Sequence, residues 1–120
     1  MRSIAVYCGS NFGRGDGYLK AAVALGQTLA AQSIRLVYGG TTKGLMGVVA
    51  DATLRAGGEV HGVITEKLVE RGQLHNGLTS HDVVPDMRSR KARMAQLAEG
   101  FVAMPGGIGT LEELFEIWVE

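Results

Sequence analysis

Short apolar runs recur along the chain and are separated by longer amphipathic segments. The first run, SIAVYC, is continuous rather than alternating, as in strands that are buried on both faces of a parallel sheet. The later runs have the length of strands and end close to glycine or proline. The pattern predicts strands within residues 3–8, 34–38, 60–64, 78–84 and 101–104.

Between these runs, apolar residues return at the three- and four-residue spacing of helices. In the first such segment they are Leu19, Val23, Gly26 and Ala30, and many alanines there suggest close packing on the sheet. Asp86, like Asp16 before the first helix, can cap a helix N-terminus. The pattern predicts helices over residues 17–32, 45–56, 87–99 and from 111 onward, with a short helical turn over 66–72.

Strand and helix alternate throughout, which argues for an α/β fold with a single domain over residues 1–120. We expect a right-handed, doubly wound parallel sheet whose carboxyl-end loops form the site. Residues 73–77 have no periodicity, and we interpret them as a surface loop that could act as a lid. The last predicted helix reaches Glu120 without a glycine cap while still carrying Trp118. This pattern predicts a chain truncated at its C-terminus, or an apolar face covered by a partner chain.

Composition limits the partners that the protein can have. Twelve basic and twelve acidic residues balance, so general attraction to nucleic acid or to an anionic membrane is not expected. No apolar run approaches the length of a signal-peptide core or a membrane span. The single cysteine, Cys8, excludes an internal disulfide bond and fits a reducing compartment. We therefore expect a cytoplasmic protein that binds a small molecule.

Glycine-rich loops follow three of the predicted strands, at residues 8–13, 38–44 and 105–110. The third loop, PGGIGT, leads from a strand into a helix, where unpaired N–H groups and the helix dipole favour an anion. Each loop alone is a weak signal, because a glycine after a strand is often only part of a tight turn. Together, the three loops would line one edge of the sheet. None is a Walker A loop or a GxGxxG fingerprint. A mononucleotide or a sugar phosphate therefore fits better than NAD or ATP.

The helix predicted over residues 87–99 places two cations, Arg90 and Lys91, on its apolar face, together with Met87, Met94, Leu97 and Ala98. One interpretation is that their aliphatic stems pack against the core while the charged ends reach water. The other is that two cations on an inward face bind an anion, since a guanidinium can hold phosphate or carboxylate oxygens in a bidentate fork.

Glu113 lies in the first turn of the last predicted helix. It can simply stabilise the helix dipole, which is worth about 0.3–1 kcal/mol. A carboxylate beside a phosphate site is nevertheless unfavourable unless it has a chemical role, such as activating water or facing a developing cation. The three histidines have no metal-like spacing, and Ser10 has no assignable triad. No metal site is predicted.

The segment PGGIGTLEE, residues 105–113, resembles the PGGxGTxxE motif of the LONELY GUY (LOG) family. Members of this family are cytokinin riboside 5'-monophosphate phosphoribohydrolases, also described as possible lysine decarboxylases. AVYCGSNFG, YGGTTKGLMG and MRSRKARM resemble the family's first loop, second loop and MxxRK helix. The second loop has Thr41 where the family usually has a third glycine, so Thr41 must tolerate that backbone conformation or the loop must differ.

The resemblance implies a Rossmann-like homodimer that hydrolyses the N-glycosidic bond of a nucleoside 5'-monophosphate, such as cytokinin riboside 5'-monophosphate or AMP. The products would be the free base and ribose 5-phosphate, and no cofactor is implied. Carried over by position, the catalytic residues are Arg90 and Glu113. The implied substrate-binding residues are Lys91, Gly106, Gly107, Gly109, Thr110, Ser10, Gly40 and Met87.

Two other functions stay open at the level of sequence. The chain could be a general purine nucleotide nucleosidase, or a nucleotide- or cofactor-binding carrier that uses this fold without catalysis. The presence of both Arg90 and Glu113 argues against the carrier. Lysine decarboxylation finds no support, because no lysine stands out as a Schiff-base site for pyridoxal phosphate.

Overall fold

The protein is an α/β domain built on a parallel sheet. The structure, a computed structural model, describes residues 2–7 and 17–103. Within these residues the strands form one sheet in the order β4-β3-β2-β1-β5, and all neighbouring strands are parallel. This confirms the α/β fold and the parallel sheet predicted from the sequence. The strands are β1 (Ser3–Tyr7), β2 (Arg35–Tyr38), β3 (Val60–Thr65), β4 (Ser80–Val84) and β5 (Gly100–Ala103).

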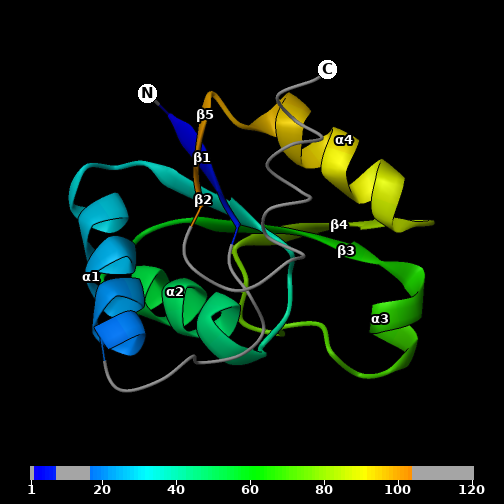
Figure 1. Cartoon of the computed structure of the whole chain (residues 1–120), viewed down its shortest axis with the longest axis horizontal. Helices are drawn as coiled ribbons and strands as arrows, with labels where there is room; N and C mark the ends of the chain where they lie inside the picture. Colours follow the sequence, from blue (N-terminus) through cyan, green and yellow to red (C-terminus); the bar gives the residue numbers. More distant parts are fainter. Residues whose placement is uncertain (1, 8–16, 104–120) are drawn as a thin grey trace.

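Helices cover both faces of the sheet (Figure 1). Helices α1 and α2 pack on one face, where Leu36, Tyr38 and Val60 belong to the larger core cluster. Helix α4 packs on the other face, where Val37 and Val63 contact Met94 in a second cluster. Because successive strand residues point to opposite faces, a strand buried on both sides has to be continuously apolar, as predicted. The helices are α1 (Gly17–Ala31), α2 (Gly44–Arg55), α3 (Glu66–Glu70) and α4 (Met87–Leu97).

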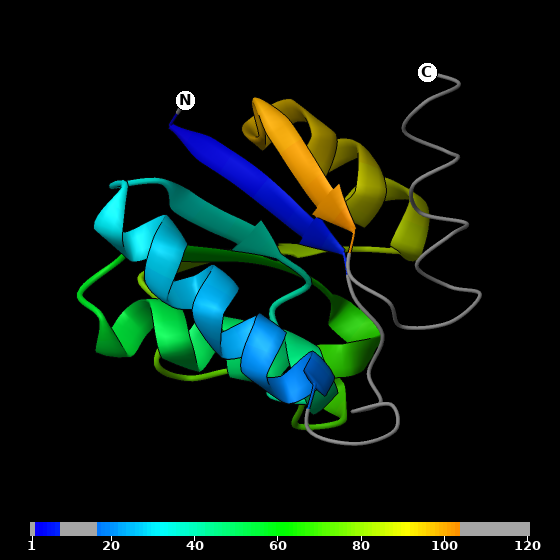
Figure 2. The ribbon, with the colours of Figure 1, turned by 60° about the vertical axis from the view of Figure 1, so that its left-hand side comes forward.

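The order of the strands reverses beside β1. From β1 the chain adds β2, β3 and β4 on one side, and then crosses back through α4 to pair β5 with the other side of β1. Figure 2 shows β1 and β5 side by side with their carboxyl ends at the same edge. Ligands of such sheets bind at the carboxyl edge, beside the point of reversal. In the sequence, two of the predicted glycine loops follow directly after these two strands.

The buried stripe of α1 differs from the predicted one. Its buried residues are Ala22, Gly26 and Leu29, whereas Leu19 is 38% exposed. The reason is that α1 packs on α2 as well as on the sheet. A Cβ atom at Gly26 would lie 2.7 Å from the carbonyl oxygen of Val49, so the two helix backbones approach closely at this glycine. Because α1 also packs against α2, its buried face differs from the face that periodicity alone predicted.

Helix α4 ends two residues before the predicted boundary. Its C-cap, Ala98, is already extended (φ −96°, ψ 141°). The N–H of Glu99 donates to the carbonyl oxygen of Ser3 at 2.9 Å, so the chain has joined the edge of β1 before Gly100. Gly100 therefore begins β5 rather than ending the helix. Within the described part of the chain, every helix is too short or too polar to cross a membrane.

Candidate functional site

The loop after β2 forms part of the carboxyl edge of the sheet. Gly40 has a left-handed backbone (φ +80°), which glycine adopts without strain, and Thr41 does not. The expected conflict at Thr41 therefore does not arise. Thr41 is buried, and its carbonyl oxygen accepts a hydrogen bond from the hydroxyl of Tyr38 at 2.8 Å. The loop does not need glycine at position 41, because its left-handed residues are Gly40 and Gly44.

Arg90 reaches this edge from the first turns of α4. Asp86 caps the helix as predicted, since its Oδ1 accepts from the N–H of Ser89 at 2.7 Å. Arg90 is 6% exposed, and its guanidinium group points at the sheet. Nε donates to the carbonyl oxygen of Val63 at 2.9 Å, and Nη2 donates to that of Gly39 at 2.8 Å. The guanidinium group is thereby fixed across the carboxyl ends of β2 and β3.

Gly39 makes the room that this guanidinium group occupies. A Cβ atom built on Gly39 would lie 1.6 Å from Nη2 and 2.7 Å from Cζ of Arg90. No side chain can share that volume, so the position of Arg90 requires glycine here. The role of Gly39 could not be predicted from the sequence, because a glycine after a strand is equally typical of an ordinary turn.

Two other predicted residues lie on the same helix. Met87 is 43% exposed rather than packed on the apolar face, because it stands at the start of α4, where the helix leaves the edge strand β4. Its Sδ still contacts Nη1 of Arg90 at 3.3 Å. Lys91 is partly buried beside Arg90. The structure therefore brings Arg90, Met87 and the Gly39–Gly40 loop together at one edge.

The remaining predicted site residues lie outside the described residues. They are Ser10, Gly106, Gly107, Gly109, Thr110 and the catalytic candidate Glu113. The strands that precede them in the sequence, β1 and β5, are hydrogen-bonded neighbours.

A polar network on the α4 face was not foreseen. His61 on β3 lies 2.6 Å from Ser80 Oγ through Nδ1 and 3.1 Å from Asp82 Oδ2 through Nε2. The same Oδ2 accepts from Nε of Arg93 on α4 at 2.9 Å. A neutral ring satisfies both contacts when Nε2–H donates to Asp82 and the Ser80 hydroxyl donates to Nδ1. The network joins β3, β4 and α4. Its members are far apart in the sequence, and the register of β3 and β4 brings His61 next to Ser80 and Asp82.

This network predicts a pH-dependent contribution to stability. The hydrogen bond from Arg93, with further help from His61, lowers the pKa of Asp82 below its ordinary value of 3.8. A lowered pKa means that the stabilisation is present at neutral pH and is lost as pH falls through the folded-state value. We expect Asp82→Asn to lower the free energy of unfolding by about 1 kcal/mol at pH 7, since the carboxylate is partly exposed.

Urea unfolding at pH 7 and pH 3 checks this expectation. The difference between wild type and Asp82→Asn should shrink at pH 3. The matched control is Glu59→Gln, at an exposed carboxylate outside the network, which should show no such convergence. An equal loss at both pH values would contradict the electrostatic account.

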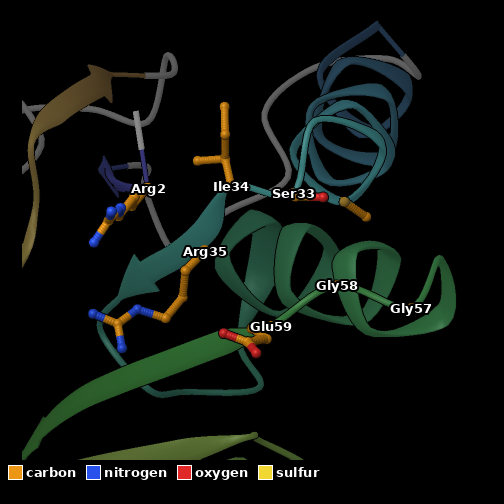
Figure 3. A pocket seen from close by; sticks show the side chains of 8 residues that line it. Arg2, Ser33, Ile34, Arg35, Gly57, Gly58 and Glu59 are labelled. Atoms are coloured by element: carbon orange, nitrogen blue, oxygen red, sulfur yellow. The ribbon is translucent and has the colours of Figure 1, made fainter.

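A hollow of about 330 Å³ lies at the opposite, amino-terminal edge of the sheet. In Figure 3 the side chains of Arg2 and Arg35 extend toward the same side of it, with Glu59 nearby. Helices α1 and α2 end at this edge, so their carbonyl groups and the Glu59 carboxylate oppose an anion. We therefore place the functional site at the carboxyl edge of the sheet instead.

Comparison with known proteins identifies a family and several relatives. A family model described as possible lysine decarboxylase matches residues 46–120. A cytokinin riboside 5'-monophosphate phosphoribohydrolase of Rhodococcoides fascians is 48% identical over 117 residues, covering 97% of this chain and 59% of that protein. The cytokinin riboside 5'-monophosphate phosphoribohydrolase LOG7 of Arabidopsis thaliana is 45% identical, covering 98% of this chain and 54% of that protein. The chain thus spans about half the length of the curated relatives it matches.

Solved structures share the fold at lower identity. A molybdenum cofactor carrier protein of Chlamydomonas reinhardtii superposes with a TM-score of 0.83 at 22% identity, covering 98% of this chain and 70% of that one. A molybdenum cofactor binding protein of Rippkaea orientalis gives a TM-score of 0.80 at 23% identity, covering 95% of this chain and 68% of that one. At these identities the likeness shows the fold alone.

Proposed function

The chain belongs to the family described as possible lysine decarboxylase, the family of the LONELY GUY (LOG) proteins, and on this premise we propose that it hydrolyses nucleoside 5'-monophosphates. The substrate is a cytokinin riboside 5'-monophosphate or AMP, and the products are the free base and ribose 5-phosphate. Support comes from relatives of 45% and 48% identity that are named for this reaction. The observation that carries the proposal is the buried guanidinium group of Arg90, fixed at the carboxyl edge of the sheet.

The reaction breaks the bond between C1′ of ribose and a ring nitrogen of the base. The electron pair of that bond leaves with the base, which takes up a proton, while water adds its hydroxyl group to C1′. Positive charge develops on the sugar in an oxocarbenium-like transition state, which a nearby carboxylate stabilises. We assign this carboxylate to Glu113, which also activates the water. Neither step needs a metal or a redox cofactor.

Arg90 anchors the nucleotide and offsets negative charge in the site. Its two carbonyl contacts hold the planar group in one orientation, so little conformational entropy is lost when the substrate binds. The phosphate is assigned to the amides of the third glycine loop and to Lys91. The full set of proposed binding residues is Lys91, Gly106, Gly107, Gly109, Thr110, Ser10, Gly40 and Met87.

The proposed unit is a single nucleotide-binding domain over residues 1–120 that acts as a homodimer in the cytoplasm. In support of a dimer, Met87 is 43% exposed at the start of α4, where its Sδ contacts Arg90, and Val83 is 48% exposed on the edge strand β4. Exposed apolar side chains favour a protein contact. A mass measured by light scattering at twice the mass of the chain would support the dimer, and a monomer mass would exclude it.

A substrate panel tests the proposed function. The chain is incubated with AMP, N6-isopentenyladenosine 5'-monophosphate, GMP, CMP and adenosine, and the free base is measured by chromatography. We expect base release from the adenine nucleotides and none from adenosine, because adenosine lacks the phosphate. Equal release from AMP and GMP would favour a general purine nucleotide nucleosidase. AMP that binds but stays intact would favour a carrier and overturn the hydrolase.

A further inference from the structure

The loop between α3 and β4 is anchored on the second glycine loop. Leu74 forms an antiparallel bridge with Thr41, and the N–H of His75 donates to the carbonyl oxygen of Gly40 at 2.9 Å. The predicted surface loop is therefore joined to the carboxyl edge by backbone hydrogen bonds. These contacts put His75 next to Gly40, which follows Gly39, whose carbonyl oxygen accepts from Arg90.

The ring of His75 makes two hydrogen bonds whose directions can be assigned. The N–H of Gly77 donates to Nδ1 at 2.9 Å, so Nδ1 carries no hydrogen. The neutral ring then has its hydrogen on Nε2, which lies 2.7 Å from Oδ1 of Asp51 on α2. The side chain is 12% exposed. His75 is thus held from α2 on one side and from its own loop on the other.

A continuous set of contacts leads from this histidine to Arg90. Asp51 holds the ring of His75, the backbone of His75 holds Gly40, and the preceding Gly39 accepts from Arg90 Nη2. Gly40 has little freedom to move. A Cβ atom on it would lie 3.0 Å from Cβ of Ile64, and its Cα would lie 2.8 Å from a Cβ atom on Gly62. The glycine loop is therefore confined between β3 and the His75 loop.

We propose that His75, held by Asp51, is a positioning residue that fixes the Gly39–Gly40 loop and, through the Gly39 carbonyl group, orients Arg90 for catalysis. The inference rests on the proposed nucleotide hydrolysis. His75 itself does not touch the reacting atoms. Its bond to Asp51 is the important one, because that bond joins the loop to α2.

Two substitutions separate the two ring bonds. In His75→Gln, the side-chain nitrogen of glutamine reaches about as far as Nε2 of histidine and can donate to Asp51. This variant has no acceptor at the place of Nδ1, so the N–H of Gly77 loses its partner. The amide oxygen of His75→Asn lies near the place of Nδ1 and can accept from Gly77, but it cannot reach Asp51. The matched control is His81→Asn, at an exposed histidine on β4.

We measure kcat/KM for AMP and the rate of trypsin cleavage after Arg71, which is exposed at the start of the loop. His75→Asn should lower kcat/KM about tenfold and speed cleavage by a similar factor, the size expected of one partly buried hydrogen bond. His75→Gln should stay within about threefold of wild type on both measures, since it keeps that bond. His81→Asn should change neither.

The dependence on Arg90 is tested in an Arg90→Lys background, where lysine cannot make the same forked contacts. If His75 acts through Arg90, adding His75→Asn should lower kcat/KM no further. The proposal would be overturned if His75→Asn lowered kcat/KM in the Arg90→Lys background by its full factor. It would also be overturned if His75→Gln lost as much activity as His75→Asn. If wild type releases no base at all, the proposed function fails together with the catalytic part of this inference. Cleavage after Arg71 then still decides whether His75 holds the loop.

Discussion

Replacement of Arg90 by alanine is expected to lower kcat/KM for AMP by about 10²–10³-fold, the usual effect of removing one preorganised donor from an active site. The guanidinium group is buried and fixed by the carbonyl oxygens of Val63 and Gly39, so alanine at this position removes a donor that is already held in place. Arg90→Lys keeps the positive charge but loses the planar fork. We expect this variant to recover only a small part of the lost activity.

The Arg90→Ala substitution also lowers the stability of the fold. Arg90→Ala leaves two carbonyl groups without their donor, which costs about 1–3 kcal/mol if both stay buried. Rates must therefore be compared at a temperature where circular dichroism shows both variants folded. A folded Arg90→Ala variant with wild-type kcat/KM would remove Arg90 from the catalytic site.

Substitution of alanine for Gly39 is the second large expected effect. The new methyl group would occupy the place of Arg90 Nη2, so the guanidinium group must move by more than an ångström. Displacement of a positioning group by that distance can cost about 100-fold in rate. Gly39→Ala should therefore reproduce most of the loss seen in Arg90→Ala, although the mutated residue itself contributes no side chain to the site.

Gly17→Ala is the matched control for this experiment. Gly17 begins α1, and an added Cβ atom would meet no atom of the described residues within 4 Å. Its kcat/KM should stay at the wild-type value. If Gly39→Ala were as active as Gly17→Ala, activity would not depend on the position of the Arg90 guanidinium group seen in the structure, and this prediction would be wrong.

The sequence predicted the α/β fold and the succession of strands and helices because each signal was local and repeated. Continuous apolar runs such as residues 3–8 gave the strands, and Asp86 marked the start of α4. The helical wheel also placed Arg90 and Met94 on the inward face, and both are buried. The boundary at Ala98 was missed because pairing of Glu99 with β1 ended the helix, and no local propensity reports such pairing.

The site was less predictable where contacts join distant segments. The sequence offered an anion or water as partners for the buried guanidinium group, whereas the structure supplies the carbonyl oxygens of Val63 and Gly39. The network of His61 and Asp82 depends on the register of β3 and β4. The contacts of His75 depend on how a loop without periodicity folds onto another loop. None of these follows from spacing along the chain.

The central claim is that the chain hydrolyses the N-glycosidic bond of a nucleoside 5'-monophosphate at this carboxyl-edge site. Its most direct test measures adenine and ribose 5-phosphate together after incubation of wild type and Glu113→Gln with AMP. The account predicts equal molar amounts of the two products from wild type and a large loss of both in a folded Glu113→Gln variant. AMP left intact by the wild-type chain, or full turnover by the folded variant, would contradict it.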